Sequence, residues 1–231
     1  MFFVAGRVRD TLEVSWPAGT FTVSTHDYDV SRRTYVSGPY GLERLLRAGE
    51  LVDVRGREVL EIGANIGTTT VPLITVLGAA HVHAFEPIPR NLELLARNVA
   101  LNHLEDRVTV HAAAVSDRIG TLTFSVPERF WGSSRVAQDG VEQVPCTTVD
   151  ALALEPALVW IDVEGHESAV LAGALSLAAV PIVLEHDPAQ QADLERLHAE
   201  IARRGGRLFD LASGDEVGLA NLGVTDLLIL P

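Results

Sequence analysis

Short apolar runs alternate with helix-like stretches along most of the chain after residue 57. Each run is four to six residues long, rich in Val, Ile and Leu, and bounded by turn residues, which is typical of buried strands. The intervening stretches repeat apolar residues at the three- and four-residue spacing of a helix face. This alternation predicts an α/β protein with a doubly wound sheet. The expected strands are residues 59–62, 82–85, 108–113, 158–161, 180–184, 208–211 and 226–230.

The first 41 residues follow a different pattern, because polar and apolar positions alternate there with the period of strands. The strands expected from this alternation are 2–4, 11–14 and 20–23. The next stretch, 26–41, is polar, aromatic and rich in turn residues, so it predicts either a connecting loop or a lid with substrate contacts. We therefore expect a small N-terminal β appendage with a possible lid at 1–41, and a main domain at 42–231.

Two further β-like runs, 121–126 and 141–146, follow the third expected strand of the main domain. The loop between them contains Phe130 and Trp131 in a polar setting. We predict a hairpin insertion there, in which Trp131 either contacts the substrate or packs against the sheet.

Charge and composition narrow the class of partner. The net charge is −13 and the pI about 4.9, so a polyanion would be repelled and a nucleic-acid partner is disfavoured. No apolar run approaches the ~20 residues of a membrane helix, and the short apolar patch at the start precedes its basic residues, unlike a signal peptide. The single cysteine, Cys146, excludes an intrachain disulfide and a cysteine cluster for zinc. We expect a cytoplasmic protein with no membrane partner.

A glycine turn joins the first strand of the main domain to a helix. The apolar run at 59–62 ends at Gly63, and Asn65 and Gly67 follow at two-residue steps. Free N–H groups at a helix start favour an electron-rich ligand group. Glu86 ends the next strand, 19 residues after Gly67, near the spacing of a carboxylate that binds both hydroxyls of a ribose. This order predicts a nucleoside site.

The turn departs from the G-x-G-x-x-G pattern of dinucleotide sites, because Asn65 replaces the second glycine and the third comes one residue early. Glu61, just before the turn, would repel a pyrophosphate and attract an ammonium or sulfonium. S-adenosylmethionine carries both of these cations and a ribose. The turn therefore favours this molecule over a dinucleotide.

Five motifs together resemble the FkbM family of S-adenosylmethionine-dependent methyltransferases. They are residues 59–67 (VLEIGANIG), 84–87 (AFEP), Asn98-x-x-x-Asn102, 114–117 (AVSD) and 161–167 (IDVEGHE). The resemblance covers about residues 38–185, and Trp160 stands where the family often has lysine. It implies a Rossmann-like class I sheet of seven strands with the last one antiparallel. It also implies S-adenosylmethionine as cofactor and acceptor hydroxyls on secondary metabolites or sugars, as in natural product biosynthesis.

The donor site is expected at the carboxyl ends of the parallel strands, where open α/β sheets bind ligands. Ser116 and Asp117 end the third strand and could approach the adenine, although they could equally form a simple turn. The predicted donor contacts are Glu61, Gly63, Ala64, Asn65, Gly67, Glu86, Pro87, Ser116, Asp117 and Asp162.

The predicted catalytic residues are His166, Asp162 and Glu164, which follow the 158–161 strand. Transfer to a hydroxyl requires removal of its proton, and a neutral histidine at a helix start suits this role. His166 could instead be a capping or core histidine, and Asp162 could cap the following helix. Asp162, Glu164, Glu185 and His186 are also hard metal ligands, but their spacing fits no self-sufficient binding loop, so we predict no metal.

The predicted acceptor is a small molecule, and its expected contacts are Arg32, Tyr35, Tyr40, Trp131, Glu185 and His186. The leading hypothesis is O-methylation of a hydroxyl. The alternatives are N-methylation of an amine or a peptide side chain, and a protein of another class: a nucleoside-binding module without catalysis, or a dinucleotide oxidoreductase.

Overall fold

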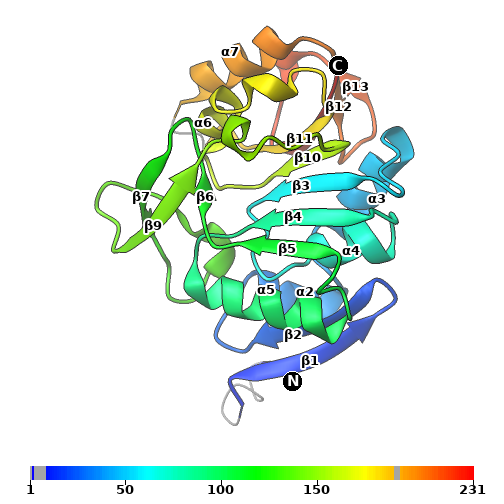
Figure 1. Cartoon of the computed structure of the whole chain (residues 1–231), viewed down its shortest axis with the longest axis vertical. Coiled ribbons are helices and arrows are strands. Elements are labelled where there is room, and N and C mark those ends of the chain that lie inside the picture. Colours follow the sequence, from blue (N-terminus) through cyan, green and yellow to red (C-terminus); the bar gives the residue numbers. More distant parts are fainter. Residues whose placement is uncertain (1, 3–8, 190–192) are drawn as a thin grey trace.

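The computed structural model describes residues 2, 9–189 and 193–231. Within these residues, one central sheet contains eight strands in the order β13-β12-β14-β11-β10-β3-β4-β5, and two smaller sheets lie beside it (Figure 1). The central strands are β3 (Glu58–Ile62), β4 (His81–Phe85), β5 (Val108–His111), β10 (Leu158–Ile161), β11 (Ile182–His186), β12 (Arg207–Asp210), β13 (Glu216–Val217) and β14 (Thr225–Leu230). The helices are α2 (Val30–Ser37), α3 (Leu42–Leu51), α4 (Thr70–Thr75), α5 (Pro89–Leu101), α6 (Glu167–Ala172) and α7 (Leu194–Arg204).

The strand order confirms the predicted doubly wound, class I methyltransferase sheet. Strands β3, β4 and β5 run outward in one direction, and β10 and β11 continue in the other, all parallel. The last strand, β14, is antiparallel to both of its neighbours, β11 and β12. The two-residue β13 adds an eighth strand at the edge. The order therefore reverses between β3 and β10, where such sheets bind ligands.

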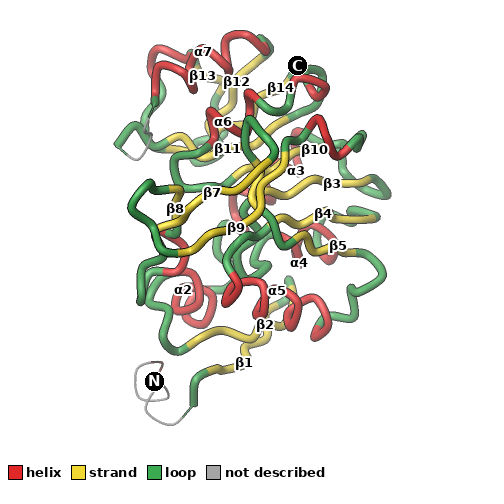
Figure 2. The backbone as a smooth tube through the Cα atoms, turned by 60° about the vertical axis from the view of Figure 1, so that its left-hand side comes forward, coloured by secondary structure: helices red, strands yellow, loops and turns green. Residues whose placement is uncertain are grey.

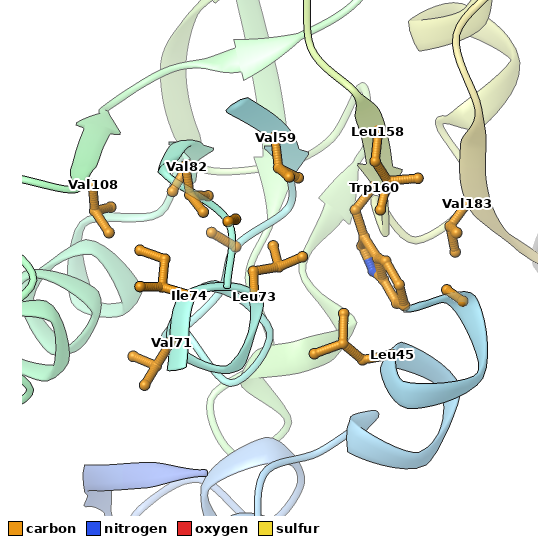
Figure 3. Close-up of a cluster of buried hydrophobic side chains, with 14 of the residues drawn as sticks. Leu45, Val59, Val71, Leu73, Ile74, Val82, Val108, Leu158, Trp160 and Val183 are labelled. Carbon is orange, nitrogen blue, oxygen red and sulfur yellow. The ribbon is translucent and has the colours of Figure 1, made fainter. Parts of the chain in front are cut away.

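Helices cover both faces of the sheet, because neighbouring residues of a buried strand point to opposite sides. Side chains of α3, α4 and α5 pack on one face, in the cluster with Leu45, Val59, Leu73 and Trp160 shown in Figure 3. Side chains of α6 and α7 pack on the other face. Trp160 fills this first core where the resembling family often has lysine, so a lysine role at that position has no counterpart here.

The N-terminal hairpin consists of β1 (Thr11–Trp16) and β2 (Gly19–Ser24), as predicted. Side-chain amides of α5 bind its free edge: Asn98 Oδ1 accepts from Thr22 N at 2.6 Å, and Asn98 Nδ2 donates to Thr22 O at 3.1 Å. Asn102, one turn later, binds Thr20 in the same way at 2.8 and 2.7 Å. This pairing explains the Asn-x-x-x-Asn spacing, since residues four apart share one helix face.

The hairpin also contributes fully buried Phe21 and Val23 to the core of the main sheet. The boundary near residue 41 therefore stays a prediction. The strand expected at 2–4 lies largely outside the described residues.

The stretch 26–41 is not the predicted loop, because it contains the helix α2. Its buried residues include Ser31 and Thr34 beside Val30, so the inward face is largely polar and lacks the apolar period of a helix. The role of this stretch as a lid stays a prediction.

The hairpin insertion is confirmed. It forms a second sheet from β6 (Ala114–Val115), β7 (Gly120–Ser125), β8 (Arg135–Val136) and β9 (Glu142–Thr147), with β7 and β9 antiparallel. Figure 2 brings this sheet forward. In the part of the chain that the structure describes, no helix is long and apolar enough to cross a membrane.

Candidate active site

A pocket opens where the strand order reverses, and it holds about 1110 Å³ of empty space, part of it open to solvent. Its walls come from three parts of the fold: the strand ends, the helices α2 and α3, and the insertion. The strand ends contribute residues 62–65, 85–88, 113–115 and 162–164, with Glu185 and Asp226.

The glycine turn after β3 lies on the floor of this pocket. Gly63 has a φ of +93°, and a Cβ built there would lie 1.8 Å from the Asp162 carbonyl oxygen. Glycine is therefore required because the ends of β3 and β10 approach closely. Ala64 and Asn65 line the pocket, and Asn65 is itself left-handed with a φ of 49°. Gly67, in contrast, lies outside the lining and faces Leu95.

Glu86 is held rigidly at the end of β4, where it is 4% exposed. One carboxylate oxygen accepts from Asn65 N at 2.9 Å, and the other accepts from Ile88 N at 2.8 Å and from Asn91 Nδ2 at 3.3 Å. Burial raises its pKa to about 7, opposed by these N–H donors. A carboxylate has about four lone-pair sites, so one remains for a ligand hydroxyl.

Asn91 is a pocket residue that the sequence reasoning missed. It is 1% exposed, and its Oδ1 has no hydrogen-bond partner among the described residues. A buried amide oxygen without a partner is costly, and a ligand donor would satisfy it. Asn91 is the third residue of α5, and no motif in the sequence around it indicated a ligand contact.

Glu61 lies outside the pocket lining, although it was predicted to contact the cationic end of the donor. Its side chain is buried and accepts from Thr70 Oγ1 of α4 at 2.6 Å. Burial raises its pKa to about 7. The physical reason is that α4 covers Glu61 through Thr70, since Trp160, its partner in the strand register, points to the same face and does line the pocket.

Asp162, Glu164 and Glu185 form an acidic cluster at the ends of β10 and β11. One oxygen from each carboxylate lies within 4.8 Å of the others, an arrangement that could hold a divalent cation. Burial and then the charge of acidic neighbours raise the pKa of Glu164 to about 8 and that of Asp162 well above its ordinary value. Burial and then Glu167 and Asp226 raise the pKa of Glu185 to about 7. At neutral pH the cluster therefore retains protons.

An ion pair from distant parts of the chain borders this cluster. Asp226 of β14 lies opposite Glu185 in the antiparallel register and pairs with Arg44 of α3. The Arg44 guanidinium also lies 5.0 Å from the centre of the Tyr40 ring. Asp29, just before α2, lines the same side, and burial raises its pKa. Neither the spacing nor the motifs in the sequence indicated Arg44, Asp226 or Asp29.

His166 lines the pocket and immediately precedes α6. Its Nε2 lies 2.9 Å from the Oγ of Ser116, and burial lowers its pKa. Ser116 and Asp117, both predicted adenine contacts, lie outside the lining; Asp117 accepts instead from Arg196 Nη2 of α7 at 2.9 Å. Ser116 thus positions the histidine ring, and Asp117 anchors α7.

Three of the predicted substrate contacts, Tyr40, Trp131 and Glu185, line the pocket, together with the predicted donor contact Pro87. Three others lie elsewhere. Arg32 is exposed on α2, and the Tyr35 ring packs 5.4 Å from that of Phe2.

His186 is fully buried on the face of β11 opposite to Glu185, which corrects its prediction as a substrate contact. Its Nδ1 donates to Gly223 O at 2.6 Å, and its Nε2 lies 3.0 Å from that of His198. Successive residues of a strand cannot face the same pocket.

The insertion and the segment before α2 join over the pocket. Trp131, in a short 3₁₀ turn (Trp131–Ser133), donates its backbone N–H to Asp27 Oδ1 at 3.1 Å. Tyr28 N donates to Arg129 O at 2.7 Å. The Arg90 guanidinium stacks on the Trp131 ring at 4.4 Å. These contacts fix an aromatic wall beside the acidic cluster.

Comparison with known proteins matches this chain to a methyltransferase family and to individual methyltransferases. Residues 61–208 match the Methyltransferase FkbM domain. The chain is 30% identical over 207 residues to the hexuronic acid methyltransferase AglP of Haloferax volcanii, which covers 84% of this chain and 82% of that protein. It is 35% identical over 86 residues to a tRNA wybutosine-synthesizing protein 2 homolog of Danio rerio, which covers 37% of this chain but only 20% of that protein.

Solved structures share the fold at low sequence identity. The FkbM methyltransferase of Methylobacillus flagellatus KT has a TM-score of 0.52 at 18% identity, covering 75% of this chain and 43% of that one. Pyrococcus horikoshii TYW2, in complex with MeSAdo, has a TM-score of 0.52 at 15% identity, covering 95% of this chain and 70% of that one. The chain thus spans less than half of the first of these proteins.

Proposed function

Because the chain belongs to the methyltransferase FkbM family, and is a methyltransferase whose donor is S-adenosylmethionine, we propose that its acceptor is a hydroxyl of a small polyhydroxylated molecule such as a sugar. The observation that carries this proposal is the wall beyond the glycine turn. There the carboxylates of Glu164 and Glu185 lie in one pocket with the aromatic rings of Tyr40 and Trp131. Carboxylates accept hydrogen bonds from hydroxyls, and aromatic faces pack on apolar C–H surfaces.

The residues at the glycine turn fit the donor. Gly63 lets the turn pack against the Asp162 carbonyl, Glu86 has acceptor capacity for one ribose hydroxyl, and the buried Asn91 Oδ1 has no donor among the described residues. We assign the adenine wall to residues 113–115, which line the pocket, in place of Ser116 and Asp117. S-adenosylmethionine supplies an electrophilic methyl group on a sulfonium, so the chain has to align the acceptor and take up its proton.

The relatives support a carbohydrate acceptor. The Haloferax volcanii relative is a hexuronic acid methyltransferase and matches over most of both chains. The tRNA-modifying proteins share the fold or a short segment. A net charge of −13 and an acidic pocket disfavour an RNA acceptor, because phosphates would be repelled.

N-methylation is the second candidate, and the acidic cluster favours it. Three carboxylates within 4.8 Å of one another could hold an ammonium group. An amine that loses its proton in solution would also need no base on the protein.

The test is methyl transfer from isotopically labelled S-adenosylmethionine to a panel of neutral sugars, uronic acids, amines and a short RNA. Product mass identifies the acceptor, and NMR locates the new methyl group on oxygen or nitrogen. We expect labelled O-methyl sugars, and no label with Gly63→Ala, whose Cβ would force the ends of β3 and β10 apart at the donor turn. Label found only on amines or RNA would overturn the proposal. Binding of S-adenosylhomocysteine without transfer to any acceptor would favour a non-catalytic module.

A further inference from the structure

We propose that the Glu164 carboxylate takes the proton from the acceptor hydroxyl and that Glu185, beside it, acts as a positioning residue through its charge. This inference rests on the proposed hydroxyl acceptor. Both side chains line the pocket, and their carboxylate oxygens lie within 4.8 Å of each other. The sequence alone favoured His166 as the base. The groups that surround Glu164 differ from those that surround His166, and this difference favours Glu164.

The backbone presents Glu164 to the pocket in a fixed orientation. Its φ is 52°, a left-handed conformation that is uncommon for residues other than glycine. The turn is held by Glu167, whose Oε1 accepts from Val163 N at 3.2 Å and from Gly165 N at 3.4 Å. Strained residues persist where the surrounding structure determines them, and they concentrate at functional sites.

The charged groups around Glu164 place it on the acceptor side. They are Glu185 from β11, Asp29 from the start of α2, Glu167 from α6 and Arg135 from β8, and the Asp162 carboxylate lies within 4.8 Å in the same cluster. The backbone carbonyl of Asp162 packs against Gly63, so this residue joins the donor turn to the acidic cluster that it shares with Glu164. Glu164 thus faces the segments that carry the aromatic wall.

His166 faces a different set of groups. Its ring is tied to Ser116 Oγ, and the charges that act on it are Asp117, Arg118 and Arg196. The histidine therefore lies toward the wall after β5, while the carboxylate lies toward α2 and the insertion.

The proposed step balances without a further reactant. The acceptor oxygen forms a bond to the methyl carbon while the carbon–sulfur bond breaks, and the electron pair of that bond remains on sulfur. The hydroxyl proton passes to Glu164, which becomes a neutral carboxylic acid. A base works best with a pKa near the operating pH, and that of Glu164 is raised to about 8 by burial and by its acidic neighbours. The positive charge of bound S-adenosylmethionine would lower the pKa of Glu164 toward neutral pH.

The experiment uses the acceptor identified in the labelling panel and compares Glu164→Gln, His166→Gln and Glu185→Gln. Glu105→Gln, on an exposed turn before β5, is the matched control for the change of carboxylate to amide. Calorimetry with S-adenosylhomocysteine shows that each variant is folded and binds the donor site. We expect Glu164→Gln to lower kcat by about 10²–10⁴-fold with S-adenosylhomocysteine affinity within twofold of wild type.

The pH profile separates a base from a structural residue. Wild-type kcat should fall on the acid side with an apparent pKa below about 8 at saturating donor. Glu185→Gln should move this limb to lower pH, because the charge of Glu185 raises the pKa of Glu164. Since the wild-type profile requires no variant, a flat rate between pH 6 and 9 overturns the proposal even if Glu164→Gln does not fold.

Other outcomes also overturn it. If Glu164→Gln keeps its rate while His166→Gln loses both rate and acid limb, His166 is the base. If EDTA abolishes wild-type transfer and Mg²⁺ restores it, the acidic cluster holds a cation instead. Wild type that methylates only amines overturns the proposed function and this inference together, whereas a Glu164→Gln variant active on hydroxyls overturns the inference alone.

Discussion

Replacing Glu86 by Ala removes the carboxylate that we assign to the donor ribose. Each charged hydrogen bond lost costs about 1.5–3 kcal/mol, and three N–H donors leave the carboxylate one site for a ribose hydroxyl, so the predicted loss is about 1.5–3 kcal/mol. This corresponds to a fall of about 10–10²-fold in affinity. The same change leaves the N–H groups of Asn65 and Ile88 without their carboxylate partner, so the donor-free protein should also lose about 1–3 kcal/mol of stability for each.

The assay is isothermal calorimetry with S-adenosylhomocysteine, at a temperature where thermal melting shows the variant to be folded. Glu61→Gln is the companion variant, because Glu61 is equally buried, has a similarly raised pKa and lies outside the pocket. We expect its S-adenosylhomocysteine affinity to stay within about threefold of wild type. A folded Glu86→Ala protein with affinity that close to wild type would refute the assignment, and a large loss in Glu61→Gln would restore Glu61 as a donor contact.

Three further predictions follow from other parts of the fold. Gly63→Ala should abolish S-adenosylhomocysteine binding, since its Cβ would meet the Asp162 carbonyl at 1.8 Å; measurable binding by calorimetry contradicts this. Asn98→Ala should cost about 3–5 kcal/mol in chemical denaturation, because its amide binds Thr22 N, Thr22 O and Ile66 O; a loss under 1 kcal/mol would show that water replaces it. The melting temperature of the donor-free protein should rise as the pH falls from about 8 to 6.5. In that window the folded state still holds protons on Glu61, Glu86, Glu164 and Glu185, whose pKa values are raised to about 7 or 8. The same carboxyls in the unfolded state, with a pKa near 4.5, have already lost them, so lowering the pH favours the folded state. A melting temperature that falls instead would contradict these shifts.

The succession of strands and helices along the chain, the glycine turn and the acids at the strand ends could be predicted from the sequence because each is a local pattern. A buried parallel strand needs a continuous apolar run, and the residue after it enters the ligand crevice. Gly63, Glu86, Asp162 and Glu164 were found in this way, and all four line the pocket. The hairpin insertion was equally visible, since its two runs alternate around a loop.

The tertiary structure decided which side of each strand faces the pocket and which distant groups meet there. Glu61 and His186 sit one residue from pocket residues, yet helices on opposite faces of the sheet cover them, α4 at Thr70 and α7 at His198. The Arg44–Asp226 pair joins residues 182 positions apart, and Ser116 reaches His166 across 50. No periodicity along the chain encodes such contacts, because they depend on how α3, β14 and the insertion pack around the reversed strand order. Local patterns along the chain are therefore enough to predict the donor turn and the strand-end acids, whereas only the packing of distant segments brings the Arg44–Asp226 pair and Trp131 to the same pocket.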